Sequence, residues 1–121
     1  MPVNPIEASL RNLPDLIIID LRGEIDAKGE ELLDQVYSDA EKMNPGAIVL
    51  NFSNVGYINS TGIALIVSML AKARKTGVKL MAFGLSSHYI EIFQITRLSD
   101  FMKIYPDEAS VLSAIQQKTD S

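Results

Sequence analysis

The chain has 121 residues, of which 47% are hydrophobic and 21% charged, and its formal net charge is −4. This length suits one domain with its own core, and the mild acidity offers no basic surface to nucleic acid or to an anionic membrane. Because the chain has no cysteine, disulfides and thiolate chemistry are excluded. The amino terminus lacks the basic start and apolar core of a signal peptide, and no apolar run is long enough to span a bilayer, so we expect a cytoplasmic protein.

The first part of the chain predicts two strands and a helix. Residues 6–13 indicate a weak strand, and a turn leads into residues 16–21, a strongly apolar strand that Gly23 ends. We expect these two strands to form a hairpin. A helix follows, with Asp26 as its N-cap and an end before the turn at residues 44–46.

In the centre of the sequence the apolar pattern changes from strand to helix. Residues 48–52 form a short apolar run that predicts a buried strand. The next apolar residues recur at helical spacing and predict the core-facing stripe of a helix over residues 62–75: Ile63, Ile66, Val67 and Leu70. The chain must therefore bend between Ser53 and Gly62.

Three residues before this helix are of the types that cap helix N-termini: Asn59, Ser60 and Thr61. A hydroxyl at such a position can also carry a phosphate, because the free amides and the positive end of the helix dipole stabilise the added charge. Capping is the ordinary role of these residues. The tripeptide alone therefore does not separate a plain cap from a modification site.

The same helix has an apolar flank outside its core-facing stripe. Leu65 and Met69 fall on this flank, and Leu85, in the loop after the next strand, can extend it. Either the flank is a surface for a partner, or a neighbouring helix covers it. Exposure of Leu65 and Met69 would favour a partner surface, whereas burial of both would move the interface to the loops.

The last third of the chain continues the alternation of strand and helix. Residues 78–83 predict a strand, residues 86–95 a short helix capped by a serine, and residues 102–105 an edge strand. Residues 106–117 predict a closing helix whose inner face consists of Val111, Leu112 and Ile115. This order predicts an α/β fold with a mixed, mostly parallel sheet of four to five strands and about four covering helices.

Few residues in the sequence suit catalysis. The one histidine, His88, has no triad frame around it, no GxSxG motif surrounds Ser60, and neither a Walker A loop nor a GxGxxG motif occurs. The acidic residues of the first helix have surface spacing without nearby histidine or cysteine, so no metal or cofactor is predicted. We expect a binding protein and not an enzyme. An enzyme with Ser60 as nucleophile is the least favoured alternative, because no general base is visible.

Residues 51–62, together with the apolar helix after them, resemble the signature of anti-sigma factor antagonists and of the wider STAS domain family. In that signature an aspartate, a phosphorylatable serine, a serine or threonine and a glycine follow a strand and a loop. Residues 23–26, Gly-Glu-Ile-Asp, resemble the second hallmark of the family, at the end of an earlier strand. The order of elements also matches the STAS fold, so the resemblance implies a single STAS domain over residues 1–121.

The resemblance implies a small binding module, a monomer or weak dimer that needs no cofactor. When unphosphorylated, such a module captures an anti-sigma factor that is also a serine kinase and so releases a sigma factor; when phosphorylated, it lets go. Ser60 aligns with the family's phosphoserine, and Thr61 is the less favoured site. The kinase partner would supply ATP, Mg²⁺ and the catalytic groups. The candidate partner-binding residues are those of the polar segment and the apolar flank: Asp26, Asn59, Ser60, Thr61, Gly62, Leu65, Met69 and Leu85.

The sequence departs from the family pattern at Asn59, which stands where the family usually has aspartate. An amide keeps the shape and the hydrogen-bonding oxygen but loses the negative charge. Either phosphorylation by a typical kinase is slow or absent, or Asn59 is a harmless variant of the cap. The alternative function is an unphosphorylated STAS subunit of a larger complex, such as a lipid-transport accessory or a stress-signalling scaffold.

Overall fold

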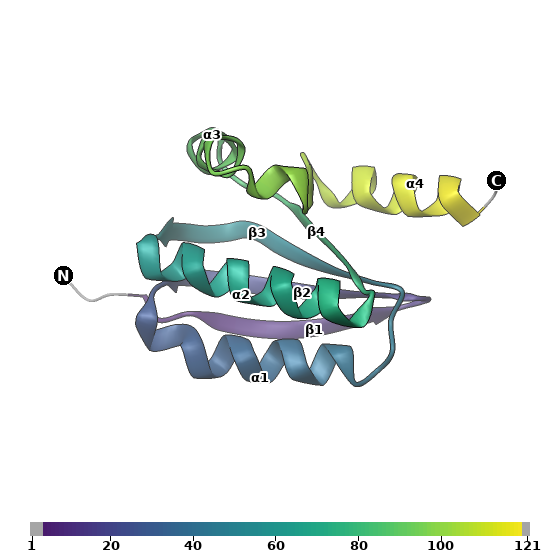
Figure 1. Ribbon diagram of the computed structural model, residues 1–121, viewed down its shortest axis with the longest axis horizontal. Helices are drawn as coiled ribbons and strands as arrows, with labels where there is room; N and C mark the ends of the chain where they lie inside the picture. Colours follow the sequence, from purple (N-terminus) through teal and green to yellow (C-terminus); the bar gives the residue numbers. More distant parts are fainter. Residues whose placement is uncertain (1–3, 120–121) are drawn as a thin grey trace.

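The computed structural model describes residues 4–119, which form a five-stranded sheet with helices on both faces (Figure 1). In chain order the elements are β1 (Glu7–Leu13), β2 (Leu16–Ile25), the 3-10 helix η1 (Ala27–Gly29), α1 (Glu30–Glu41), β3 (Ala47–Ile58), α2 (Ser60–Thr76), β4 (Lys79–Phe83), α3 (Ser87–Ile95), the 3-10 helix η2 (Leu98–Asp100), β5 (Lys103–Tyr105) and α4 (Glu108–Thr119). The predicted α/β fold, with its mixed sheet and four α-helices among the described residues, is confirmed.

The strands lie in the sheet in the same order as in the chain. β1 and β2 form the predicted antiparallel hairpin, which closes at the pair Leu13 and Leu16, and all other neighbouring strands are parallel. Parallel neighbours need a crossover connection, which α1, α2 and α3 supply in turn. The carboxyl ends of β2, β3 and β4 therefore meet at one edge of the sheet.

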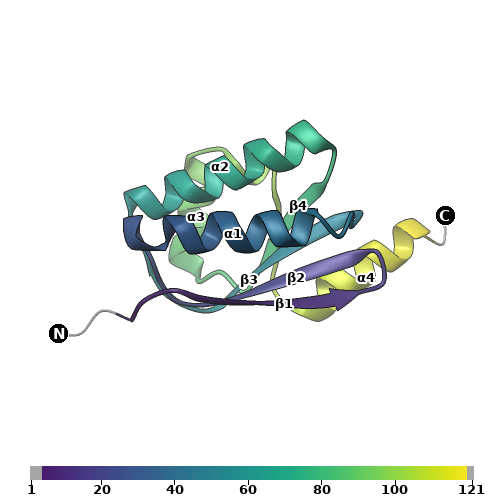
Figure 2. The same ribbon diagram turned by 90° about the horizontal axis from the view of Figure 1, so that it is seen from below.

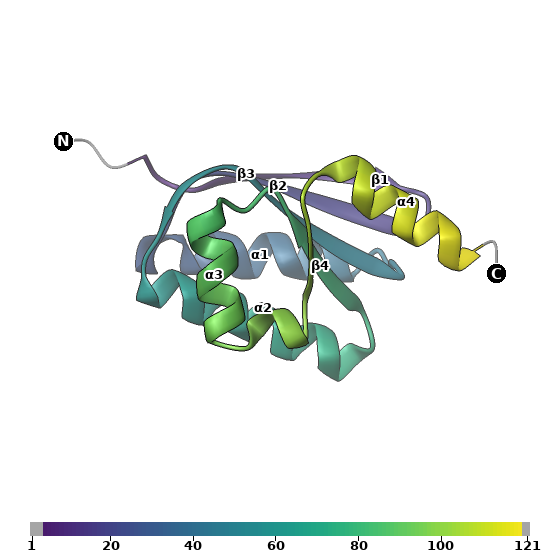
Figure 3. The same cartoon turned by 90° about the horizontal axis from the view of Figure 1, so that it is seen from above.

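Each face of the sheet has its own core. Helices α1, α2 and α3 cover one face and α4 covers the other (Figures 2 and 3). The smaller core, beneath α4, consists of Leu16, Ile18, Ala47, Val49, Met81, Phe83 and Val111. Because successive strand residues point to opposite faces, burial of both faces explains the unbroken apolar runs of β2 and β3.

Two strands are longer than predicted. β2 passes through Gly23, at φ +105°, and continues to Ile25. A Cβ atom on Gly23 would lie 2.5 Å from the carbonyl oxygen of Pro5, so this irregular part of the ladder accepts only glycine. β3 does not bend after its apolar half but continues to Ile58, because its polar half stays paired with β2. The connection from β3 to α2 is therefore a single residue.

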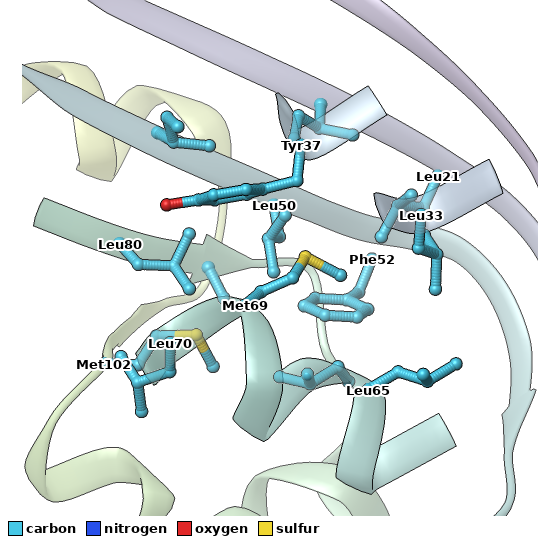
Figure 4. Packing of buried hydrophobic residues seen from close by; sticks show 14 of the residues in the cluster. Leu21, Leu33, Tyr37, Leu50, Phe52, Leu65, Met69, Leu70, Leu80 and Met102 are labelled. Carbon is cyan, nitrogen blue, oxygen red and sulfur yellow. The ribbon is translucent and has the colours of Figure 1, made fainter. Parts of the chain in front are cut away.

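The apolar flank of α2 is covered, and the prediction that it forms a partner surface is wrong. Leu65 and Met69 are 9% and 1% exposed, and Figure 4 shows both among the packed side chains of the larger core. α1 packs beside α2 and contributes Tyr37 to the same core, which widens the buried arc of the helix. Val67, predicted to face the core, is instead 43% exposed, and Leu85 is buried. The candidate interface therefore moves to the loops at the ends of the strands.

The carboxyl-terminal elements follow the predicted order. Ser86 caps α3, and α4 buries Val111 and half-buries Ile115. Leu112 was predicted on the inner face but is 37% exposed. It directly follows Val111 on α4, so it already turns away from the sheet face that Val111 contacts. Between residues 4 and 119 no helix is both long enough and apolar enough to cross a membrane.

Candidate functional site

The connection from β3 to α2 lies at the carboxyl edge of the parallel strands. Ile25 and Ile58, the last residues of β2 and β3, are register partners, so Asp26 and Asn59 follow them at the same edge. Figure 1 shows that η1, which leads into α1, and α2 begin at this same end of the sheet. We call residues 59–62 the Ser60 corner. The structure thus brings together the two segments that carry the family resemblance.

Asn59 is the residue that caps α2. Its backbone is extended, with φ −88° and ψ −179°, and its Oδ1 accepts a hydrogen bond of 2.8 Å from the N–H of Gly62. The backbone N–H of Asn59 donates to the carbonyl oxygen of Ile25 at 3.2 Å. The side chain of Asn59 therefore satisfies a free amide of the first turn, while the backbone of the same residue is hydrogen-bonded to β2. The amide supplies the acceptor that an aspartate would supply, without the charge.

Gly62 allows α2 to start directly against β2. A Cβ atom on this residue would lie 2.3 Å from the carbonyl oxygen of Ile25 and 2.9 Å from Cγ2 of Ile58. Since the nearest atom belongs to the backbone, a side chain could be accommodated only if the helix moved. The glycine of the motif is therefore required by close packing between the helix and the strand.

Ser60 and Thr61 are exposed in the first turn of α2. Because Asn59 supplies the cap, the hydroxyl of Ser60 is not needed for it, and within the described part of the chain this hydroxyl makes no hydrogen bond. A modifying enzyme can reach it. The positive end of a 17-residue helix also favours an anion at this position.

The segment of the chain that contains the Ser60 corner carries no formal charge. No charged residue occurs between Leu50 and Lys72, so the second half of β3 and most of α2 are neutral. Charge returns in the last turns of α2, where Arg74 and Lys75 complement the dipole and Gly77, at φ 78°, ends the helix. A phosphate on Ser60 would be the only formal charge in this neutral stretch.

Tyr89 of α3 contacts the strand end just before the Ser60 corner. Its hydroxyl accepts a hydrogen bond of 2.8 Å from the N–H of Ile58 and donates to the carbonyl oxygen of Ile58 at 3.4 Å. The tyrosine is buried, and the neighbouring exposed His88 packs its ring against it with centroids 4.9 Å apart. No local pattern in the sequence marks this contact, because 31 residues separate Tyr89 from Ile58.

Asp26 is a cap, as predicted, but for a different element. Its Oδ1 accepts a hydrogen bond of 3.0 Å from the N–H of Lys28 and so caps η1, which precedes α1. The side chain is partly exposed. A direct role in partner binding remains a prediction.

A second polar cluster lies on the face of the sheet that α4 covers. Arg11 donates to both carboxylate oxygens of Asp20, at 2.6 and 2.8 Å, and also to Glu108 of α4, at 2.7 and 3.1 Å. The hydrogen bonds from Arg11, with another from Asn51, hold the pKa of Asp20 below its ordinary value, against the effect of burial. The cluster ties α4 to β1 and β2. Over residues 4–119 there is no group of three or more metal-binding side chains.

The chain is similar in sequence to a known family and to proteins of known function. Residues 7–111 match the family model described as the STAS domain. The anti-sigma-B factor antagonist of Listeria monocytogenes is 35% identical over 94 residues, which cover 74% of this chain and 79% of that protein.

Solved structures show the same fold. The anti-sigma factor antagonist of Mycobacterium paratuberculosis has a TM-score of 0.74 at 22% identity, covering 92% of this chain and 94% of the other. The phosphorylated form of SpoIIAA from Bacillus has a TM-score of 0.69 at 19% identity, covering 89% of this chain and 99% of the other.

Proposed function

Because the chain belongs to the STAS domain family, and within it to the anti-sigma factor antagonists, we propose that it is a binding module switched by phosphorylation of Ser60. In the unphosphorylated form a single STAS domain captures an anti-sigma factor that is also a serine kinase, and a sigma factor is released. The kinase supplies ATP and Mg²⁺ and phosphorylates Ser60, and the modified module then dissociates. The chain itself performs no catalysis in this scheme.

The observation that carries the proposal is the free, exposed hydroxyl of Ser60 at the start of α2. Asn59 makes the capping hydrogen bond to Gly62, so phosphorylation of Ser60 leaves the cap in place. The positive end of the helix dipole stabilises the phosphate. Asn59 adds no negative charge that would repel it. The neutral amide is therefore compatible with a phosphorylated neighbour.

The phosphate weakens partner binding through charge and desolvation. It adds about −1.5 to −2 charges near pH 7, in a stretch where the chain has none. A partner that packs against the unmodified corner would have to remove water from this group, and burial of an unpaired charge is costly. The surface proposed for the partner comprises Asp26, Asn59, Ser60 and Thr61, with the exposed face of α2 that continues through Ala64 and Val67.

The experiment that tests the switch combines detection of phosphate with binding. Protein isolated from its native host in growth and under stress is analysed by intact and peptide mass spectrometry, with Ser60→Ala as control. We expect one phosphate, on Ser60, whose occupancy changes with stress and which Ser60→Ala abolishes. Phosphate on Thr61 alone would contradict the assignment of the site.

Binding is then measured with the anti-sigma factor recovered from the same host. Ser60→Glu should bind at least about tenfold more weakly than the native chain, whereas Ser113→Glu should bind like the native chain. Ser113 is a matched control because it is also an exposed helical serine, on α4 and therefore on the other face of the sheet. Native affinity in Ser60→Glu would refute the switch.

Asn59 is the one observation that favours the alternative, an unphosphorylated STAS subunit of a larger complex. If a typical kinase needs the aspartate charge to orient the hydroxyl or to hold a partner cation, the native chain is a poor substrate. Good peptide coverage without phosphate in any condition, together with a stable complex on affinity capture, would support this alternative. Asn59→Asp should then convert the chain into a substrate of the kinase.

A further inference from the structure

β3 is longer than β4, its neighbour on one side, and extends beyond the end of that strand. The pairing of β3 with β4 ends at Asn51 and Phe83, whereas its pairing with β2 continues to Ile25 and Ile58. The second half of β3 therefore has one edge without a neighbouring strand. Backbone groups on such an edge need other partners when they are buried. Ile58, at the end of this edge, is only 5% exposed.

Tyr89 takes the place of the missing strand at Ile58. Its hydroxyl bonds to the N–H of Ile58 at 2.8 Å and to its carbonyl oxygen at 3.4 Å. The peptide group that joins Ile58 and Asn59 is therefore held on both sides. Its carbonyl oxygen, from Ile58, accepts from Tyr89, and its N–H, from Asn59, donates to the carbonyl oxygen of Ile25 at 3.2 Å. A rotation of this peptide group would have to break hydrogen bonds on both sides. It is the last peptide group before the residue that caps α2.

Helix α3 is anchored so that Tyr89 reaches this position. The side chain of Ser86 caps the helix by accepting a hydrogen bond from the N–H of Tyr89 at 3.4 Å. One turn later Phe93 packs edge-on against Phe52 of β3, with ring centroids 6.3 Å apart and an interplanar angle of 88°. Two residues on one face of α3 therefore contact the same strand.

We propose that Tyr89 is a positioning residue that couples α3 to the Ser60 corner. A charge placed on Ser60 attracts the free amides of the first turn of α2 and shifts the peptide group that precedes Asn59. Tyr89 is bonded to that group, so the shift reaches α3, whose outer side includes the exposed residues His88 and Glu91. The phosphorylation state of Ser60 would thus be readable on a second surface. This inference rests on the proposed function only for the natural source of the charge.

The test measures amide chemical shifts by NMR in the isolated chain of 121 residues. Ser60→Glu is introduced into the native sequence, into Tyr89→Phe and into Tyr37→Phe. Tyr37 is the matched control because it is also a buried tyrosine, but its hydroxyl lies near Glu41 of α1 and, within the described residues, makes no hydrogen bond to β3 or to the Ser60 corner. We expect Ser60→Glu to shift the amides of α3 in the native and Tyr37→Phe backgrounds. In the Tyr89→Phe background these shifts should fall by at least half.

A second measurement separates positioning from general stability. In Tyr89→Phe, hydrogen exchange at Ile58 should accelerate by about tenfold or more relative to the buried amide of Ile18, because the N–H of Ile58 loses its partner, whereas the N–H of Asn59 keeps its bond to Ile25. Equal α3 shifts in the Tyr89→Phe and native backgrounds would overturn the proposal, as would uniform acceleration of exchange. If Tyr89→Phe does not fold, the test rests on Ser60→Glu in the otherwise native chain. Unchanged chemical shifts of the α3 amides in that variant would refute the coupling. None of these results requires a kinase, so they are independent of whether Ser60 is phosphorylated in the host.

Discussion

Replacement of Gly62 by alanine should destabilise the protein, although helix propensity alone predicts the opposite. Within a helix, alanine is ordinarily more stabilising than glycine by roughly 0.5–1 kcal/mol. Here the new Cβ would lie 2.3 Å from the carbonyl oxygen of Ile25, whereas carbon and oxygen approach to about 3.3 Å in close contacts. The start of α2 must therefore retreat by about 1 Å. Overpacking of this kind costs roughly 1–3 kcal/mol, so after the gain in helix propensity the net loss lies between about 0 and 2.5 kcal/mol, and we expect about 1–2 kcal/mol because the nearest atom is backbone.

Urea unfolding and thermal unfolding would measure this loss directly. For a domain of this size, about 1–2 kcal/mol corresponds to a fall in Tm of roughly 4–8 °C, with an unchanged urea slope. Gly56→Ala is the matched control, because nothing lies within 4 Å of its added Cβ. We expect Gly56→Ala to stay within about 0.5 kcal/mol of the native chain. If Gly62→Ala equals or exceeds the native stability, the close contact does not determine the start of the helix.

Three further predictions concern stability and its dependence on pH. Asn59→Ala removes the cap of α2 and should cost about 1 kcal/mol in urea unfolding, whereas Asn59→Asp should cost little. Met69→Ala should cost roughly 2–5 kcal/mol because the side chain is 1% exposed, and Val67→Ala less than about 0.5 kcal/mol; similar losses would contradict the packing of α2. Arg11 lowers the pKa of Asp20, so this carboxylate contributes stability above its ordinary pKa of 3.8 that is lost as the pH falls through the lowered folded-state pKa. Asp20→Asn should therefore flatten the acid limb of a stability profile, and an NMR titration that shows an ordinary carboxyl pKa would disprove the reasoning.

The elements with a clear apolar period were predictable from the sequence. β2 and the first half of β3 are buried on both faces, so their unbroken apolar runs identify them without knowledge of the fold. The second half of β3 was missed because Ser53, Asn54 and Gly56 have the composition of a turn. The strand nevertheless continues, because Asn54, Val55, Tyr57 and Ile58 pair with β2, and the register shifts of this ladder fall at Ser53 and Gly56.

The Ser60 corner was predictable in its residue types but not in its contacts. The three capping residues and the glycine are visible in the sequence, and the structure assigns the cap to Asn59. The need for Gly62 depends on a carbonyl oxygen in β2, and the support from Tyr89 depends on a helix 31 residues further along the chain. The burial of Met69 likewise depends on the position of α1. Such contacts follow from how the elements pack and leave no periodic signal along the chain.

The neutral stretch between Leu50 and Lys72 has a consequence for the kinetics of recognition. Among the residues proposed for the partner surface only Asp26 is charged, so the Ser60 corner itself adds little electrostatic steering, and the salt dependence of association depends on the rest of the chain, whose formal net charge is −4. A phosphate at Ser60 would add about −1.5 to −2 charges to this neutral stretch, and encounter rates would then respond more strongly to the charge of the approaching surface and to salt. In the proposed switch, phosphorylation would therefore change how fast a partner associates as well as how long it stays bound.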